Sequence, residues 1–187
     1  MEKVRIVGVD PGVRALGLVV VDHFLGWHVV GGALILEMGR DKFEQIKKKF
    51  SGVFASNAFV IEPAEDVLTC LSERIDSWWF WNRKPDLAVI EKGVFMGYAN
   101  EILLCAGWIG AELFRKGAAV EYVNPSTVKR VVLGNGRAGK CEVKDFVKRQ
   151  LGLGNGDDIK HACGFHIWDA FLYAFYGGRV ISGLDLK

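Results

Sequence analysis

The sequence lacks the features that typify secreted, membrane-spanning and disulfide-rich chains. Its four cysteines, Cys70, Cys105, Cys141 and Cys163, form no C-x-x-C pair, which argues against a disulfide framework. The longest uncharged stretch near the middle, residues 102–111, is about half the length of a membrane-spanning helix. No signal-peptide pattern precedes the first strand-like run, and there are no repeats or low-complexity segments. We therefore expect a soluble, intracellular protein.

The net charge is also low, at +2 over 187 residues, so the whole molecule is not a polycation. Hydrophobic residues make up 50% of the chain and charged residues 25%, which is typical of a globular protein and excludes disorder as the main state. A chain of this length buries roughly 70% of its unfolded surface. The expectation is a single domain, residues 1–187.

The hydrophobic pattern predicts a mixed α/β domain. Three strand-like runs with short Gly-bearing breaks come first and favour an antiparallel meander; two short apolar runs follow, separated by helical segments. The expected strands are residues 4–9, 16–21, 27–36, 87–90 and 118–123. The expected helices are residues 41–50, 63–81, 99–114, 140–151 and 164–176, with another that starts at 125. Residues 51–61 are ambiguous, and Gly177 and Gly178 are expected to end the last helix.

Three carboxylates and a histidine stand at predicted strand ends or on an apolar helix. Asp10 ends Val-Gly-Val-Asp before Pro-Gly, and Glu91 ends Leu-Ala-Val-Ile-Glu. Ligands bind at such strand ends in α/β sheets, although Asp10 alone also suits a turn-stabilising role and Glu91 alone a surface position. His166 and Asp169 lie three residues apart, so they share one helix face. The alternative for that pair is a core histidine beside a capping aspartate.

Together the carboxylates predict a metal-dependent site. Clustered carboxylates raise each other's pKa unless a cation lies between them, and oxygen-rich sites suit Mg²⁺ or Mn²⁺. Two such ions, about 3.5–4 Å apart, align a water and a phosphodiester for in-line displacement. No P-loop, nucleophile elbow or zinc motif competes. The spacing of His161, Cys163 and His166 lacks the second ligand pair of a structural zinc site, and Asp157 and Asp158 suit a helix cap.

A local excess of positive charge lies between residues 129 and 149. The basic residues there are Lys129, Arg130, Arg137, Lys140, Lys144, Lys148 and Arg149, opposed by Glu142 and Asp145. One interpretation is the solvated face of a surface helix. The other is a set of phosphate contacts beside the acidic site, aided by backbone amides of the 134–139 glycine loop.

The motifs resemble those of the RuvC-type Holliday junction resolvases, within the ribonuclease H-like/integrase superfamily. VGVDPGVRALGLVVV resembles the first strand pair of that family, and AVIEKGVFMGYAN its second motif. VNPSTVKRVVLGNGRAGKCEVKDFVKRQLGL resembles its third region, and HIWDAFLYA its last acidic helix. The resemblance extends from Val4 to about Tyr176. It implies a ribonuclease H-like mixed five-stranded sheet flanked by helices.

The resemblance also implies a function: a Mg²⁺-dependent endonuclease, with Mn²⁺ able to substitute, that resolves four-way (Holliday) DNA junctions by paired symmetric cleavage. Asp10, Glu91, His166 and Asp169 would be the metal-binding and catalytic residues, with His166 either ligating metal or transferring a proton. Two symmetric cuts imply a homodimer, for which residues 99–114 are the candidate interface.

The resemblance assigns DNA contacts to basic and aromatic residues. Lys129 and Lys140 match DNA-contacting positions of the family, and Phe95 matches an aromatic residue that stacks on bases opened at the junction centre. The full set of expected DNA-binding residues is Phe95, Tyr98, Lys129, Arg130, Arg137, Lys140 and Lys144.

Other functions also fit parts of the sequence. A nuclease for flaps or forks fits the motifs and length equally well. A non-catalytic branched-DNA-binding protein fits less well, because such a protein would gain affinity by losing the acidic residues. A phosphotransferase with the related actin-like core fits poorly, since no second phosphate loop follows the later strands.

Overall fold

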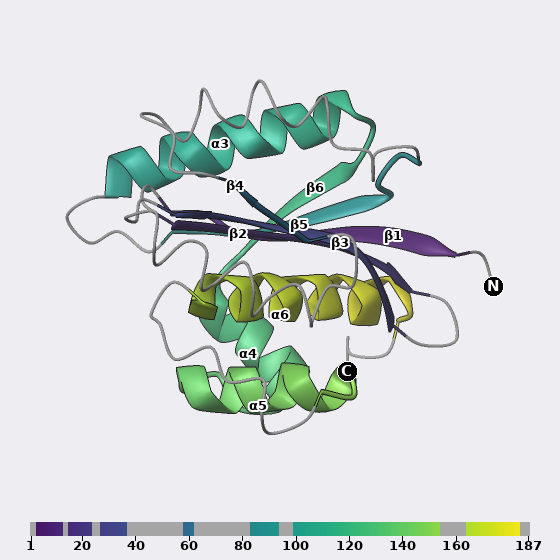
Figure 1. Cartoon of the computed structure of the whole chain (residues 1–187). Coiled ribbons are helices and arrows are strands. Elements are labelled where there is room, and N and C mark those ends of the chain that lie inside the picture. The colour runs from purple at the N-terminus through teal and green to yellow at the C-terminus, as the bar shows by residue number, and fades with distance from the viewer. Residues whose placement is uncertain are drawn as a thin grey trace.

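A six-stranded mixed sheet with helices on both faces forms the centre of the molecule (Figure 1). This computed structural model describes residues 3–12, 15–23, 27–36, 58–61, 83–93, 99–153 and 164–183. The strands are β1 (Val4–Asp10), β2 (Ala15–His23), β3 (Trp27–Leu36), β4 (Ala58–Ile61), β5 (Leu87–Glu91) and β6 (Ala119–Val123). The helices are α3 (Ala99–Arg115), α4 (Pro125–Leu133), α5 (Lys140–Gln150) and α6 (Gly164–Ile181).

The strand order is β4-β3-β2-β1-β5-β6. β1, β2 and β3 pair antiparallel, which confirms the predicted meander. β5 pairs parallel with both β1 and β6, so the carboxyl ends of these three strands meet at one edge of the sheet. Within the described residues the sheet has six strands where five were predicted, because β4 adds a parallel partner outside β3. Four apolar residues are too few for periodicity to distinguish a strand from a helix.

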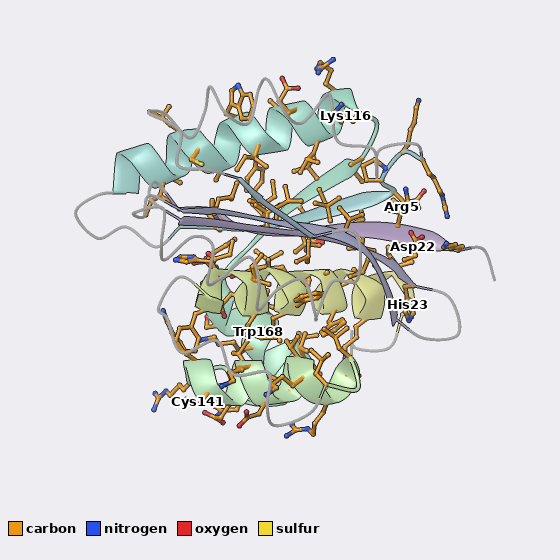
Figure 2. All side chains as sticks on the ribbon, in the orientation of Figure 1. Arg5, Asp22, His23, Lys116, Cys141 and Trp168 are labelled. Atoms are coloured by element: carbon orange, nitrogen blue, oxygen red, sulfur yellow. The ribbon has the colours of Figure 1, made fainter. Side chains whose placement is uncertain are left out.

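Two apolar cores lie on opposite faces of the sheet. Side chains of β1 alternate between them: Val7 and Val9 pack on the α3 face, and Ile6 packs on the α6 face. Figure 1 shows α3 along one face and α6 along the other, with α4 and α5 beyond α6. Figure 2 shows side chains filling both interlayer spaces. β5 is buried on both faces up to Glu91, as its uniform apolar run predicts.

α6 lies unusually close to the sheet because two strand positions are glycine. A Cβ at Gly8 would overlap the carbonyl oxygen of Ala170, and one at Gly17 would overlap that of His166. No other residue fits at either position without displacing the helix. The two glycines therefore fix α6 over the ends of β1 and β2.

The predicted end of the last helix is wrong. α6 continues through Gly177 and Gly178 to Ile181, and a left-handed glycine, Gly183, follows it at φ 66°. A Cβ at Gly177 would lie 3.0 Å from side-chain carbons of Ile6, Leu87 and Val89. Gly177 thus permits close packing on the sheet and does not terminate the helix.

α3 and α5 match their predicted ranges to within one residue, and α4 begins at the predicted residue, Pro125. Asn124 precedes Pro125 in extended conformation at the start of α4, but its side chain makes no capping hydrogen bond. The predicted helices over 41–50 and 63–81 lie outside the described residues. None of the described helices combines the length and apolar character needed to cross a bilayer.

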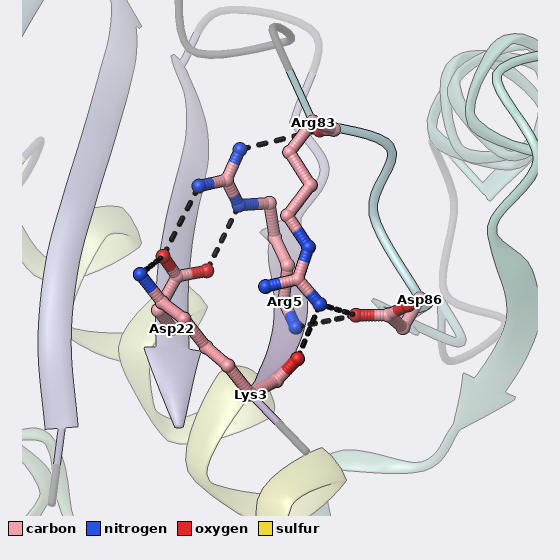
Figure 3. Close-up of polar contacts among 5 residues, drawn as sticks. All are labelled: Lys3, Arg5, Asp22, Arg83 and Asp86. Atoms are coloured by element: carbon pink, nitrogen blue, oxygen red, sulfur yellow. Dashed lines mark hydrogen bonds and ion pairs between the residues drawn. The ribbon is translucent and has the colours of Figure 1, made fainter. Parts of the chain in front are cut away.

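A buried ion pair joins β1 to β2 at the opposite end of β1 from Asp10 (Figure 3). The Arg5 guanidinium donates to both carboxylate oxygens of Asp22, at 2.9 and 3.1 Å, and Lys3 Nζ lies 2.6 Å from one of them. Arg83 and Asp86, just before β5, also bond to this end of β1. Removing one partner of a buried pair of this kind is costly, because the other charge is left buried without its counter-ion.

Candidate active site

Asp10 and Glu91 lie side by side at one edge of the sheet. The residues that precede them, Val9 and Ile90, are direct partners in the parallel β1–β5 ladder. Val9 and Ile90 both belong to the core on the α3 face. Because side chains alternate along a strand, both carboxylates project to the α6 face. Two adjacent strands thus place two carboxylates at the point where α6 begins.

α6 brings His166 and Asp169 to the same point. They are one helical turn apart, and His166 Nδ1 lies 2.7 Å from Asp10 Oδ2. Burial lowers the pKa of His166 below its ordinary value, which favours the neutral ring. A neutral ring that donates from Nδ1 to Asp10 leaves Nε2 as the free ring nitrogen.

The three carboxylates are crowded and poorly solvated. Burial raises the pKa of Asp10, and repulsion from Asp169 raises it further. Burial and then the Asp10 charge raise the pKa of Glu91. The pKa of Asp169 is raised by burial and by Glu91, with Lys129 and Lys140 opposing the rise. Placing negative charge on all three carboxylates at once is therefore costly unless a cation lies among them.

These side chains surround one cavity of about 260 Å³. Its lining residues are Asp10, Glu91, Pro125, Lys129, Lys140, His166, Asp169, Leu172 and Tyr173. Pro125 and Lys140 are the first residues of α4 and α5. Both helices therefore begin at the cavity, and their amino ends carry partial positive charge toward it.

The two lysines of the cavity are held by different contacts. Lys129 Nζ donates to the carbonyl of Ala138 at 2.8 Å, which ties α4 to the glycine loop 134–139. Lys140 Nζ lies 5.2 Å from the ring centroid of Phe165, a cation–π distance. Each contact keeps an ammonium group beside the acidic cluster and leaves capacity for further hydrogen bonds.

Comparisons with a family model, with curated proteins and with solved structures point to the same family. The family model "Crossover junction endodeoxyribonuclease RuvC" matches residues 6–167. The chain belongs to the RuvC family.

Among curated RuvC proteins, that of Mycolicibacterium vanbaalenii is 31% identical over 152 residues, covering 80% of this chain and 68% of its own. The RuvC of Frankia casuarinae is 33% identical over 153 residues, covering 80% and 77%. The Thermus thermophilus RuvC structure superposes with a TM-score of 0.58 at 22% identity, covering 96% of this chain and 97% of that one. T. thermophilus RuvC in complex with a Holliday junction substrate gives a TM-score of 0.57 at 24% identity, covering 97% of each chain.

The family assignment confirms the predicted resemblance, the ribonuclease H-like fold class and the endonuclease activity, which is that of a crossover junction endodeoxyribonuclease. Endonucleases of the RuvC family generally depend on a divalent metal ion.

The donor chemistry of the cavity fits a hydrated divalent cation. Carboxylate oxygens dominate the site, and burial together with their mutual repulsion raises the pKa values of Asp10 and Glu91. Within the described residues no three His, Cys, Asp or Glu side chains converge into a ready ligand shell. A small hard cation that keeps several of its waters needs only one or two direct carboxylates, so the cavity fits such an ion.

Of the expected DNA-binding residues that the structure describes, two line the cavity and three lie outside it. Lys129 and Lys140 line the cavity, whereas Arg130 and Arg137 are exposed outside it. Lys144 lies one turn beyond Lys140 on α5. Phe95 and Tyr98 lie outside the described residues, so their role stays a prediction.

Three cavity residues were not expected from the sequence: Pro125, Leu172 and Tyr173. The helical spacing of the sequence contains a signal for one of them, Tyr173. Tyr173 follows Asp169 by four residues and His166 by seven, which places it on the same helix face. Nothing in the sequence distinguishes it from the other aromatic residues of α6, which pack in the core.

Proposed function

We propose that this cavity cleaves phosphodiesters of four-way DNA junctions, with Asp10, Glu91, His166 and Asp169 as its metal-binding and catalytic residues. One observation supports this most strongly. Two neighbouring parallel strands and one helix bring four metal-type donors to a single cavity, and no cysteine or serine among the described residues lines it. Carboxylates without a nucleophilic side chain suit hydrolysis by an activated water.

Mg²⁺ is the proposed ion, with Mn²⁺ able to substitute. When bound, it would offset the carboxylate charge, activate water and polarise the scissile phosphate. Asp10, Glu91 and Asp169 would hold it through oxygen, the ligand type that Mg²⁺ prefers. His166, oriented by Asp10 through Nδ1, would use its Nε2 either to ligate the ion or to accept a proton from the attacking water.

The basic side chains are proposed to bring the DNA backbone to this acidic site. Lys129 and Lys140 lie on the cavity wall, where they can contact phosphates beside the cut. Arg130, Arg137 and Lys144 would extend that contact along the DNA. Phe95 and Tyr98 are proposed to stack on unpaired bases at the junction centre.

We further propose that residues 1–187 act as one nuclease domain and pair as a homodimer. Both apolar cores share the same sheet, which supports a single domain. On α3, Leu104 is 67% and Phe114 71% exposed, and Gly107 and Ala111 complete an uncharged outer stripe. An exposed apolar stripe is typical of an interface, and a two-fold dimer supplies the two active sites that paired symmetric cuts require.

A cleavage assay tests the proposal. The protein is incubated with a labelled mobile four-way junction, a flap and a linear duplex of equal length, each with Mg²⁺, with Mn²⁺ or with EDTA. We expect paired symmetric nicks on the junction only, and only with a divalent ion. Asp10→Asn should abolish the nicks, whereas Asp145→Asn, a matched change at an exposed position of α5 outside the cavity, should leave them intact.

Other results would redirect the assignment. Equal cleavage of the flap would indicate a nuclease for branched DNA in general. Junction binding without cutting in any buffer would indicate a non-catalytic binding protein. Cleavage by Asp10→Asn at the wild-type rate would contradict the residue roles.

A further inference from the structure

Tyr173 occupies the wall of the acidic cavity. It lies one turn after Asp169 on α6, and only 2% of its surface is exposed. The cavity lining includes it together with Asp10, Glu91 and Asp169. Its hydroxyl is therefore the one phenol among the described residues that meets the carboxylates of the site.

The Tyr173 hydroxyl is buried and makes no hydrogen bond of normal geometry with any described residue. Buried hydroxyl groups nearly always have a partner, and an unpaired one is costly. Tyr176 on the same helix shows the usual arrangement, since its hydroxyl donates to Glu121 Oε1 at 3.1 Å. Packing alone does not account for the Tyr173 hydroxyl, because phenylalanine would fill the same space.

The surroundings of the hydroxyl point to its partner. Among the cavity carboxylates, Glu91 lies within side-chain hydrogen-bonding reach of the Tyr173 hydroxyl, although the two groups do not meet in normal hydrogen-bond geometry. A phenol hydroxyl can donate a hydrogen bond and a carboxylate oxygen can only accept one, so the two groups are complementary. Glu91 is thus the acceptor that the position of the Tyr173 hydroxyl favours.

We propose that Tyr173 is a positioning residue, which donates a hydrogen bond to one Glu91 oxygen and thereby directs the other oxygen to the divalent ion. This inference rests on the proposed metal-dependent function and names a residue outside the four proposed ligands. A glutamate side chain has three rotatable torsions, so a fixed donor reduces the disorder that ion binding must remove. Donors that hold a ligand in this way typically change metal affinity 10- to 100-fold.

The first experiment measures ion binding without DNA. Mn²⁺ and Mg²⁺ are titrated into wild type, Tyr173→Phe and Tyr176→Phe by isothermal calorimetry. We expect Tyr173→Phe to raise the dissociation constant about 10-fold. Tyr176→Phe, the matched control, removes a buried hydroxyl whose partner Glu121 lies outside the cavity, so it should bind the ions as wild type does.

The second experiment measures junction cleavage against ion concentration. For Tyr173→Phe the half-saturating concentration should rise about 10-fold, while the rate at saturating ion returns to within about threefold of wild type. A purely structural role would lower the melting temperature and leave the half-saturating concentration unchanged. Melting curves of both variants establish that each is folded under the assay conditions.

Two results would overturn the inference: equal ion affinity in wild type and Tyr173→Phe, or an equal loss of affinity in Tyr176→Phe. Both presuppose a wild type that binds ions and cleaves the junction. A wild type that does neither would instead overturn the proposed function itself, so the two failures are distinguishable.

Discussion

His166 Nδ1 lies 2.7 Å from Asp10 Oδ2 and thereby joins the first turn of α6 to the end of β1. The two residues are far apart in sequence, and the contact depends on the close seating of α6 over Gly8 and Gly17. The bond fixes which ring nitrogen of His166 stays available. It also means that Asp10 has two roles, as a candidate ion ligand and as the group that orients the histidine.

His166→Ala should reduce single-turnover junction cleavage about 100-fold or more at saturating Mg²⁺, because it removes either an ion ligand or a proton acceptor. Junction affinity, measured in Ca²⁺ or EDTA by gel shift, should stay within about threefold of wild type, since the basic wall of the cavity remains. The matched control is His23→Ala, because His23 pairs with Val4 at the other end of the sheet. Wild-type cleavage by His166→Ala would contradict a chemical role for this histidine.

The position of Asp10 and Glu91 could be predicted because two simple rules coincide. Each ends a largely apolar run, and parallel strands bring their carboxyl ends to one edge. The placement of His166 and Asp169 on one helix face could be predicted from their spacing of three residues. Taken alone, each of these residues also suited another role. The resemblance to RuvC-type proteins indicated that they form one site.

Other features could not be predicted, because they depend on contacts between segments far apart in the sequence. A glycine in the sequence can either end a helix or permit close packing, and the residues around Gly177 do not distinguish the two. Its contact with the sheet shows that Gly177 permits close packing. The Tyr173 hydroxyl is one polar atom on an aromatic helix, so the sequence does not separate it from core residues such as Phe171. The Arg5–Asp22 pair lies in strands whose polar residues suggest exposure, yet both are buried.

Gly8→Ala should destabilise the protein by about 3 kcal/mol, because the added methyl group would overlap the backbone of α6 at Ala170. Displacing α6 also moves His166 and Asp169, so cleavage should fall together with stability. Urea unfolding gives the first quantity and the junction assay the second. Gly107→Ala on α3 is the matched control, since a Cβ there meets nothing within 4 Å, and it should stabilise by up to about 1 kcal/mol. Equal stability of the two variants would show that α6 does not need the glycine.

Asp22→Asn should destabilise the protein by about 3 kcal/mol at pH 7, because it leaves the buried Arg5 without its anion. Burial alone would raise the pKa of Asp22, but hydrogen bonds from Arg5 and Lys3 outweigh it and lower the pKa below 3.8. A lowered carboxyl pKa stabilises the folded state above about pH 4, and this contribution is lost as the pH falls through the folded-state value.

The difference between wild type and Asp22→Asn should therefore be constant from pH 7 to about 5 and shrink below pH 4. Denaturant unfolding at each pH measures it. Asp86→Asn provides the comparison, since that carboxylate is 47% exposed and its ion pair with Arg83 should contribute less than about 1 kcal/mol. A difference that grows on acidification would contradict the lowered pKa of Asp22.

Lys140→Ala should weaken junction binding and make it less sensitive to salt. If its ammonium contacts one phosphate, the slope of log affinity against log salt concentration should become shallower by about 0.9. Fluorescence anisotropy between 50 and 300 mM NaCl, in EDTA, measures the slope. Lys84→Ala serves as the control, because Lys84 lies near Gly117, away from the cavity, and should leave the slope unchanged. An unchanged slope in Lys140→Ala would restrict this lysine to its cation–π contact with Phe165 and its effect on the carboxylates.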